Sequence, residues 1–569
     1  MDISTYNGCA VRRLILILLI SLMGAACSGG GEGASDVEDQ SVSVDPNNID
    51  YSNVSDLTEA YSIDMPSNWL HMPVSDLSDN IQVLTTYHEL QENEQDLYLE
   101  NFILLKGDLT QNSPLSTGAS NLEILSTEQE TIGQHRAEIE VGKYHYDPTS
   151  GPGITLGYMS ILIPANGTYY GLQYTAEYKR FNTYKDVAKK VVESWLIGVV
   201  IENDIPSIQN SSQEFGAANI STDGDNYLVT YCIPKTRDSL SLKAKLISSK
   251  GAILKSITIA DDVPKYFRKN CESSSPKVVF DGVNYLVTYT EDSNIDVYTD
   301  TTLFGKRINR QGDILDNTPL NLATFKNHIN QASHDLAFDG NRSILVWYDK
   351  LEFDDADPSR KLFSMFIAPD GTISESSTVH DFKERYRSPV SPSVTVGPES
   401  ILVFWQEITS QYEFSELSFD GNILSSLVVK PDWDYRPLLE PLVVAGDSNF
   451  LLTWRKSSNI YGYIIDGGEI ISGGASDIPL TVYASPGGLG YLLAAITLDN
   501  GFEFLFQQNY GVHSVVISQD LSQAENEKFF HPGPMNASLD QVYVNKSVIS
   551  EDDTFTVTTL ENGTVIGWF

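Results

Sequence analysis

The chain has 569 residues, which exceeds one ordinary domain and predicts several. Its hydrophobic content of 41% and charged content of 20% supply enough apolar material for packed cores. With 76 acidic residues against 37 basic ones, the formal net charge is −39, and a surface of that sign repels phosphate backbones and anionic lipid headgroups. The composition therefore argues against nucleic-acid binding and against electrostatic attachment to a membrane.

Residues 1–26 have the pattern of a secretory signal peptide. Arg12 and Arg13 precede the apolar run 14–20, and small residues follow it. The run is shorter than the roughly 20 apolar residues of a membrane-spanning helix. Gly24-Ala-Ala-Cys27 resembles the lipobox of bacterial lipoproteins, although glycine replaces the usual large aliphatic residue. An ordinary cleaved signal with an incidental cysteine is the alternative.

The lipobox resemblance implies cleavage before Cys27 and lipidation of its thiol, with a further acyl chain such as palmitate on the new amine. Two or more acyl chains anchor a protein stably. By analogy with the family, Ser28 after the cysteine favours the outer membrane as the location of this exported lipoprotein. Residues 27–54 are mainly small and acidic, and we expect them to form a flexible tether.

Four cysteines occur in the chain, and each has a different expected fate. Cys9 leaves with the signal peptide and Cys27 is lipidated. Cys232 and Cys271 remain in an oxidising compartment, where they are candidates for a disulfide. Two free thiols remain the alternative.

Residues 55–200 predict an α+β domain, an antiparallel sheet with flanking helices. Alternating apolar and polar residues predict strands, Asn-Gly predicts a hairpin turn, and apolar residues spaced by three and four predict an amphipathic helix. The expected elements are a strand ending near Pro66, a strand at 101–105, a turn and strand within 132–141, a hairpin across Asn166-Gly167 and a helix at 184–195.

Several structural motifs of this segment resemble the PsbP-like and DcrB-like fold. These motifs are Pro66 to Trp69, Asn101-Phe102, Phe181 and Ser194-Trp195. The resemblance covers about 140 residues and implies an antiparallel sheet with helices on its faces. It also implies an envelope-associated or assembly-type role and no reaction.

Residues 201–569 repeat one pattern, an apolar strand, a tight turn and an alternating aliphatic and aromatic strand. The spacing of roughly 45–60 residues, with all-β content, is typical of propeller blades. The copies begin with Asp-Gly or a similar pair, which tolerates positive φ. They occupy 223–231, 281–289, 339–348, 397–405, 446–454, 499–506 and 552–557.

A second turn follows each well-preserved copy, and an outer strand comes after it. These second turns are Lys250-Gly251, Gln311-Gly312, Asp370-Gly371, Asp420-Gly421 and Asp466-Gly467. Seven copies and an outer-like segment at 202–208 predict seven blades, closed by that first segment on the last blade. Six blades remain the alternative, because the last two copies are degenerate.

We find no catalytic motif in the sequence, and we predict neither catalytic residues nor a required cofactor. The run 352–357 places Asp354, Asp355 and Asp357 close together, and such carboxylates suit calcium. A solvated acidic loop is the favoured alternative, because the glycine and terminal glutamate of an EF-hand loop are absent.

Four aromatic residues are candidates for ligand binding. Trp433 and Tyr435 lie in an expected loop, whereas Trp347 and Trp405 lie near strand ends. Such rings stack on sugars or anchor a partner protein. Packing between blades is the alternative, and we favour it for any single one of these residues, although the loop position of Trp433 and Tyr435 makes them the better candidates for a ligand.

The leading hypothesis is therefore a binding or scaffold protein, anchored to a membrane by lipid and presenting its propeller to an envelope protein or a glycan. The alternative is a glycan-active enzyme with a site in the propeller channel. A purely structural envelope component is a third possibility, since a fold alone does not determine function.

Overall fold

The computed structural model describes residues 49–56, 60–71, 81–89, 100–107, 119–132, 135–147, 153–202, 218–236, 239–264, 271, 276–293, 299–328, 333–350, 360–382, 390–408, 411–429, 442–456, 459–471, 480–484, 492–498, 501–508, 511–518, 528–532, 542–549, 554–560 and 565–568. The chain divides into two units, Met1–Val199 and Val200–Phe569. Within the described ranges, no helix combines the length and hydrophobicity that crossing a membrane requires.

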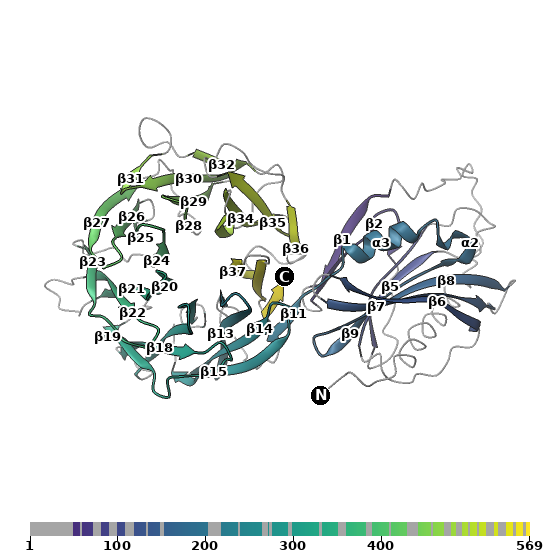
Figure 1. Cartoon of the computed structure of the whole chain (residues 1–569), viewed down its shortest axis with the longest axis horizontal. Coiled ribbons are helices and arrows are strands. Elements are labelled where there is room, and N and C mark those ends of the chain that lie inside the picture. The colour runs from purple at the N-terminus through teal and green to yellow at the C-terminus, as the bar shows by residue number, and fades with distance from the viewer. Residues whose placement is uncertain are drawn as a thin grey trace. The chain divides into compact units, whose positions relative to one another are not determined.

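The first unit is built on a seven-stranded antiparallel sheet with the strand order β3-β4-β5-β9-β8-β7-β6 (Figure 1). A smaller sheet has the order β1-β2-β10. The strands are β1 (Tyr51–Asp56), β2 (Tyr61–Pro66), β3 (Leu70–His71), β4 (Ile81–His88), β5 (Asn101–Gly107), β6 (Ala119–Ile132), β7 (His135–Tyr146), β8 (Ile154–Ala165), β9 (Thr168–Glu177) and β10 (Leu196–Ile197). The described helices are α2 (Tyr178–Phe181) and α3 (Lys185–Glu193).

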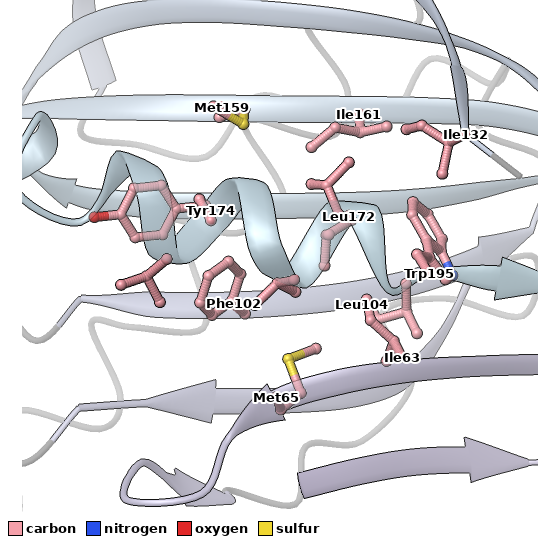
Figure 2. Close-up of a cluster of buried hydrophobic side chains, with 14 of the residues drawn as sticks. Ile63, Met65, Phe102, Leu104, Ile132, Met159, Ile161, Leu172, Tyr174 and Trp195 are labelled. Carbon is pink, nitrogen blue, oxygen red and sulfur yellow. The ribbon is translucent and has the colours of Figure 1, made fainter. Parts of the chain in front are cut away.

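The core of this unit lies between α3 and the large sheet. Val187, Ala188 and Val191 on one side of α3 are fully buried, as the predicted amphipathic pattern requires. Figure 2 shows side chains of the sheet strands, among them Met159 and Leu172, gathered around the helix ribbon. Each such burial removes an apolar side chain from water and contributes about 1.5–3 kcal/mol.

The local predictions for this unit are largely confirmed. β2 ends at Pro66, and β8 and β9 form a hairpin across Asn166 and Gly167, whose φ values of 52° and 72° fit a type I′ turn. The predicted antiparallel sheet with flanking helices is present among the described residues, where the helices are the four-residue α2 and the longer α3. The β1-β2-β10 sheet also contributes side chains to the core. β1 also begins at Tyr51, inside the segment predicted as a tether.

The second unit is a ring of seven antiparallel sheets, the architecture of a β-propeller (Figure 1). Its strands are β11 (Val199–Glu202), β12 (Asn219–Thr222), β13 (Asn226–Thr236), β14 (Ser239–Ser248), β15 (Ile253–Pro264), β16 (Lys277–Phe280), β17 (Tyr285–Asp292), β18 (Thr299–Ile308), β19 (Leu320–His328), β20 (His334–Phe338), β21 (Ser343–Lys350), β22 (Arg360–Ile367), β23 (Ser377–Phe382), β24 (Val390–Val396), β25 (Ile401–Ile408), β26 (Gln411–Leu417), β27 (Ile423–Val429), β28 (Leu442–Ala445), β29 (Phe450–Lys456), β30 (Asn459–Asp466), β31 (Glu469–Ile470), β32 (Leu480–Ala484), β33 (Leu492–Leu498), β34 (Gly501–Gln508), β35 (Gly511–Ser518), β36 (Lys528–Pro532), β37 (Val542–Ile549), β38 (Thr554–Leu560) and β39 (Val565–Trp568).

We number the blades in chain order from β12–β15, as blade 1, to blade 7. Blades 2, 3 and 4 are β16–β19, β20–β23 and β24–β27, blade 5 is β28–β32, and blade 6 is β33–β36. The innermost strands contact one another around the whole ring, and β37 of blade 7 contacts β12 of blade 1. The ring is therefore closed, and the prediction of seven blades is confirmed.

Blade 7 is completed by the first strand of the unit. Its strand order is β11-β39-β38-β37, so β11 is its outermost strand. The sequence predicted this closure but placed the strand at 202–208, several residues too late. Val199 and Ile201 are buried, and their alternation with half-buried Val200 makes Val199–Glu202 the pairing segment.

The Asp-Gly pairs are turn residues, as predicted. In blade 1 the Asp223 carboxylate accepts hydrogen bonds from the backbone N–H groups of Asp225 (3.0 Å) and Asn226 (2.7 Å). Asp281 and Asp339 accept the equivalent pairs in blades 2 and 3. These aspartates hold their own backbone in the turn.

The glycines of the second turns lie against the preceding blade. Gly421 of blade 4 has φ +83°, and a Cβ there would lie 3.0 Å from the Phe366 ring of blade 3. Gly468 of blade 5 has φ +77°, and a Cβ there would overlap the Ser425 side chain of blade 4. These positions require glycine for two reasons: the backbone is left-handed, and the neighbouring blade approaches too closely for a Cβ atom.

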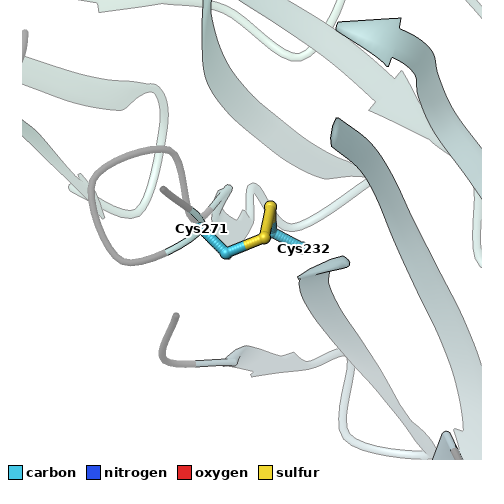
Figure 3. The surroundings of a disulfide bond; sticks show 2 residues. All are labelled: Cys232 and Cys271. Carbon is cyan, nitrogen blue, oxygen red and sulfur yellow. A yellow bond between two sulfur atoms is a disulfide. The ribbon is translucent and has the colours of Figure 1, made fainter. Parts of the chain in front are cut away.

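One disulfide joins blade 1 to the segment that leads into blade 2. Cys232 of β13 bonds to Cys271, and both side chains are buried (Figure 3). The two residues are 39 positions apart, so the bond fixes the chain between the two blades.

The contact between blades 4 and 5 gives a matched pair of substitutions. Gly467→Ala meets only the cost of positive φ, about 1–2 kcal/mol, because nothing lies within 4 Å of the added Cβ. Gly468→Ala should cost about 1–3 kcal/mol more, because the methyl group forces Ser425 to move. Hydrogen exchange in β27 and β30 measures the difference, and equal protection in both variants would contradict the close approach.

Candidate binding cleft

A cleft of about 550 Å³ opens in the first unit between α3 and the strands β6, β7 and β8. Its apolar floor consists of aliphatic and thioether side chains from these strands and from α3. The floor residues are Ile132, Ile139, Val141, Met159 and Val192, and the polar walls are Ser126, Glu128, Glu130 and Thr131 from β6 with Lys185, Lys189 and Glu193 from α3.

The periodicity of each element explains why these side chains meet. On β6, the even positions from Ser126 to Ile132 lie on one face, because side chains alternate along a strand. On α3, Lys185 and Lys189 are four residues apart and lie on the same side of the helix. The helix therefore presents two ammonium groups to a strand that presents two carboxylates.

The charges of the cleft are not neutralised by one another. In the part of the chain that the structure describes, Lys185 and Lys189 form no ion pair, and neither do Glu128 and Glu130. Lys189, Glu128 and Glu130 are exposed, whereas Met159 and Val192 on the floor are buried. The cleft thus combines an apolar floor with charges of both signs at its mouth.

β6 is also the edge strand of the seven-stranded sheet. It is last in the strand order and pairs with β7 along one side. Leu122, Ile124 and Leu125 expose between 42% and 45% of their surface. Register shifts occur up to Ser126, after which 126–132 pairs without a break. The regular part of this edge is the part that forms the cleft wall.

A separate polar cluster lies where β4, β5 and α2 meet. The Arg180 guanidinium is 3.1 Å from a Glu89 carboxylate oxygen and 3.2 Å from one of Glu100, and it donates to the Tyr184 hydroxyl at 3.1 Å. Both carboxylates are buried. Burial raises the pKa of Glu100 to about 7, although the Arg180 charge opposes that rise. A buried pair of this kind holds the elements in one arrangement.

Some polar groups on the inner strands of the propeller bond to the neighbouring blade. The His334 Nε2 and Thr288 Oγ1 atoms are 3.0 Å apart, which links blades 3 and 2. The Asp335 carboxylate accepts hydrogen bonds from the Ser393 hydroxyl (2.9 Å) and the Val394 N–H (3.0 Å), which links blades 3 and 4. These hydrogen bonds link neighbouring sheets.

Two of the predicted aromatic candidates belong to the core. Trp347 and Trp405 are 3% and 1% exposed. Trp347 stacks on Phe363 at a centroid distance of 5.5 Å, and Trp405 packs on His380 at 5.0 Å. The prediction that these two residues bind a ligand is therefore wrong, because their side chains are buried. The alternative, that they pack within the core, is the one that the structure supports.

The remaining predicted site residues lie outside the described residues. These are Cys27, Trp433, Tyr435, Asp354, Asp355 and Asp357. Lipidation, ring stacking in the loop and calcium binding therefore stay predictions. Within the described ranges, no group of His, Cys, Asp or Glu side chains is arranged to hold a metal ion.

The sequence analysis did not predict the cleft, although the spacing of its charged residues can be read from the sequence. The spacing of Lys185 and Lys189 follows from the predicted helix, and the spacing of Glu128 and Glu130 follows from a strand. The sequence predicts a turn and strand only from Ile132 onward. It predicts no strand over 119–131, because apolar and polar residues do not alternate regularly there. Without β6 the second wall was absent.

No family model matches the chain, and no curated protein matches it. Among solved structures it is similar to the β-propeller domain of the Trilobed protease from Pyrococcus furiosus, at 11% identity over 63% of this chain and 96% of that chain, with a TM-score of 0.35. It is also similar to an α-L-arabinofuranosidase from Fusarium graminearum (12% identity, 65% and 96% covered, TM-score 0.37) and to cyanobacterial PsbP from Synechocystis sp. PCC 6803 (13% identity, 30% and 98% covered, TM-score 0.21). With identities and TM-scores this low, these likenesses carry no conclusion about function.

The raised pKa of Glu100 predicts how the stability of the first unit depends on pH. Between about pH 4.5 and 7 the folded state keeps a proton on Glu100 that the unfolded state has lost. Stability therefore falls as pH rises through this window, by a few kcal/mol, since one pH unit corresponds to about 1.4 kcal/mol. Hydrogen exchange in β5 and α3, measured at pH 5 and pH 8, reports this loss.

Glu100→Gln should remove most of that pH dependence, because the amide stays neutral at both pH values. Glu128→Gln is the control, since its carboxylate is exposed. An unchanged pH dependence in Glu100→Gln would show that Glu100 ionises normally in the folded unit.

Proposed function

We propose that this chain is a lipid-anchored binding protein of a bacterial cell envelope. In this proposal residues 1–26 direct export, Cys27 carries the lipid and a short tether leads to the first unit. The outer membrane is the proposed location, on the evidence of Ser28 after the cysteine. The propeller serves as a second, rigid module for an envelope protein or a glycan.

The observation that supports a binding role most directly is the cleft beside α3. Its volume falls in the range of ligand sites, about 300–1,000 Å³. The floor supplies apolar contact, and the unpaired charges at the mouth supply orientation and specificity. Its lining contains neither histidine nor cysteine, and its charged groups are the carboxylates of Glu128, Glu130 and Glu193 and the ammonium groups of Lys185 and Lys189.

The described part of the propeller supports the role of a rigid module. Its ring is closed, and hydrogen bonds such as that between Asp335 and Ser393 fasten neighbouring blades. The polar inner-strand groups described above are engaged in these links. We propose Trp433 and Tyr435 as contacts of a partner with the propeller.

Lipidation gives a first test, with a control inside the signal peptide. Cys27→Ser removes the thiol that accepts the lipid, so the chain should lose incorporation of labelled palmitate and leave the membrane fraction. Cys9→Ser should change neither result, because Cys9 is removed with the signal peptide. Normal labelling and membrane recovery of Cys27→Ser would contradict the proposed anchor.

Photo-crosslinking in cells tests the cleft itself. A photoreactive amino acid in place of Lys189, which lines the cleft, should give a discrete adduct with a bound partner. The same substitution at Lys190 is the matched control, since this residue is exposed on the same helix outside the cleft. No adduct from position 189, or equal adducts from both positions, would contradict a binding role for the cleft.

A further inference from the structure

We propose that the cleft receives an amphipathic α-helix of a partner protein, which lies beside α3 on the face of β7. This inference rests on the proposed binding function and goes beyond it by assigning the chemistry of the ligand. The bound helix places an aliphatic stripe on the cleft floor, basic side chains toward the β6 wall and acidic side chains toward the α3 wall.

The position of α3 on the sheet supplies the first argument. In Figure 2 the helix ribbon runs along the strands, between Ile161 of β8 and Leu104 of β5, so α3 is centred over β9, the strand between these two. Packed helices lie about 8–10 Å apart, and neighbouring strands lie about 4.8 Å apart. A helix beside α3 on the cleft side therefore lies over β7, two strands from β9.

The floor of the cleft supplies the apolar surface that such a helix covers. Ile139 and Val141 of β7 are half-buried, so part of their aliphatic surface still faces water. Met159 and Val192 continue the apolar floor toward α3. Aliphatic side chains of a bound helix would remove this surface from water, which is favourable.

The same floor favours a helix over an extended chain. It consists of aliphatic and thioether side chains, which are poor hydrogen-bond partners. An extended segment on this floor would leave backbone N–H and C=O groups without partners, and that is costly. A helix satisfies its backbone groups internally and presents only side chains to the floor.

The charges of the two walls repeat with the spacing of a helix. Lys185 and Lys189 are about 6 Å apart along α3, and Glu128 and Glu130 are about 6.8 Å apart along β6. Residues i and i+4 of a bound helix are also about 6 Å apart, so a pair of bases on one flank and a pair of acids on the other match both walls. A small zwitterion carries one charge of each sign, and a fatty acid carries only the negative one.

Two further observations shift this pattern toward basic residues. Glu193 lines the cleft one turn after Lys189, and it favours a basic residue opposite it. A net charge of −39 also attracts cationic segments over distances longer than a contact. We therefore expect the bound helix to carry more basic than acidic residues.

Selection from a library of helical peptides tests this inference with the intact protein. Each displayed peptide has about 14 residues, which as a helix match the roughly 20 Å of β6 between Ser126 and Ile132. One stripe is aliphatic, and the positions on both flanks are Lys, Glu or Gln at random. We expect enrichment of peptides with bases on one flank and acids on the other, and fluorescence anisotropy measures the Kd of the most enriched peptide.

Changing the sign of one wall tests where the peptide binds. Lys185→Glu with Lys189→Glu makes both walls acidic, so this variant should weaken the enriched peptide at least about tenfold and should itself select peptides with bases on both flanks. Lys190→Glu with Lys250→Glu is the matched control, because it changes the net charge equally at exposed positions outside the cleft. The control should leave the Kd within about twofold, and hydrogen exchange in β8 confirms that both variants remain folded.

A change in the peptide tests its conformation. Proline at a central position that faces away from the cleft breaks a helix, so it should weaken binding at least about tenfold. Alanine at the same position is the control and should leave the Kd within about twofold. Equal Kd values for the two peptides would show that the ligand is not helical and would overturn the inference.

The outcomes distinguish this inference from the proposed function. Enriched peptides whose Kd is the same in the wall variant and in the control would overturn the cleft as the site of helix binding. An adduct from position 189 without any enriched helical peptide would overturn the helical ligand and leave the binding function in place. The absence of both would overturn the inference and the proposed function together.

Discussion

A small antiparallel sheet is stable only when its apolar faces are covered, and both units meet this constraint in different ways. In the propeller each blade covers the next, so the cover is complete only in a closed ring. The pairing of β11 with β39 and the contact of β37 with β12 provide that closure. The second-turn glycines and the hydrogen bonds of Asp335 depend on neighbouring blades being held at this close distance.

The first unit satisfies the same constraint incompletely, and the cleft is the result. Seven strands span about 29 Å, whereas a helix has a diameter of about 10 Å. α3 and the β1-β2-β10 sheet close the core over β5, β8 and β9. The described elements leave the face of β6 and β7 beside the helix open to the cleft, and its aliphatic residues Ile139 and Val141 are half-buried. The lysines of α3 and the glutamates of β6 border this gap.

Features that depend on neighbouring residues were predictable from the sequence, and features that depend on distant pairing were not. The Asp-Gly turns, the hairpin at Asn166-Gly167 and the buried side of α3 follow from local conformational preferences. The burial of Trp347 and Trp405 depends on which blade faces which, so their residue type alone left two interpretations open. The cleft joins β6 to α3, which are far apart in the chain, and its strand shows little hydrophobic alternation.

The completion of blade 7 by β11 also sets an order of events during synthesis. The ribosome makes β11 before every other strand of the propeller, and β39, its partner, after all the others. Blades 1 to 6 can form in turn from strands that are adjacent in the chain, but the ring stays open until β39 has been made. Closure of the ring is therefore the last step of folding and joins the two most distant strands of the unit. Pairing between segments so far apart in the chain is intrinsically slow.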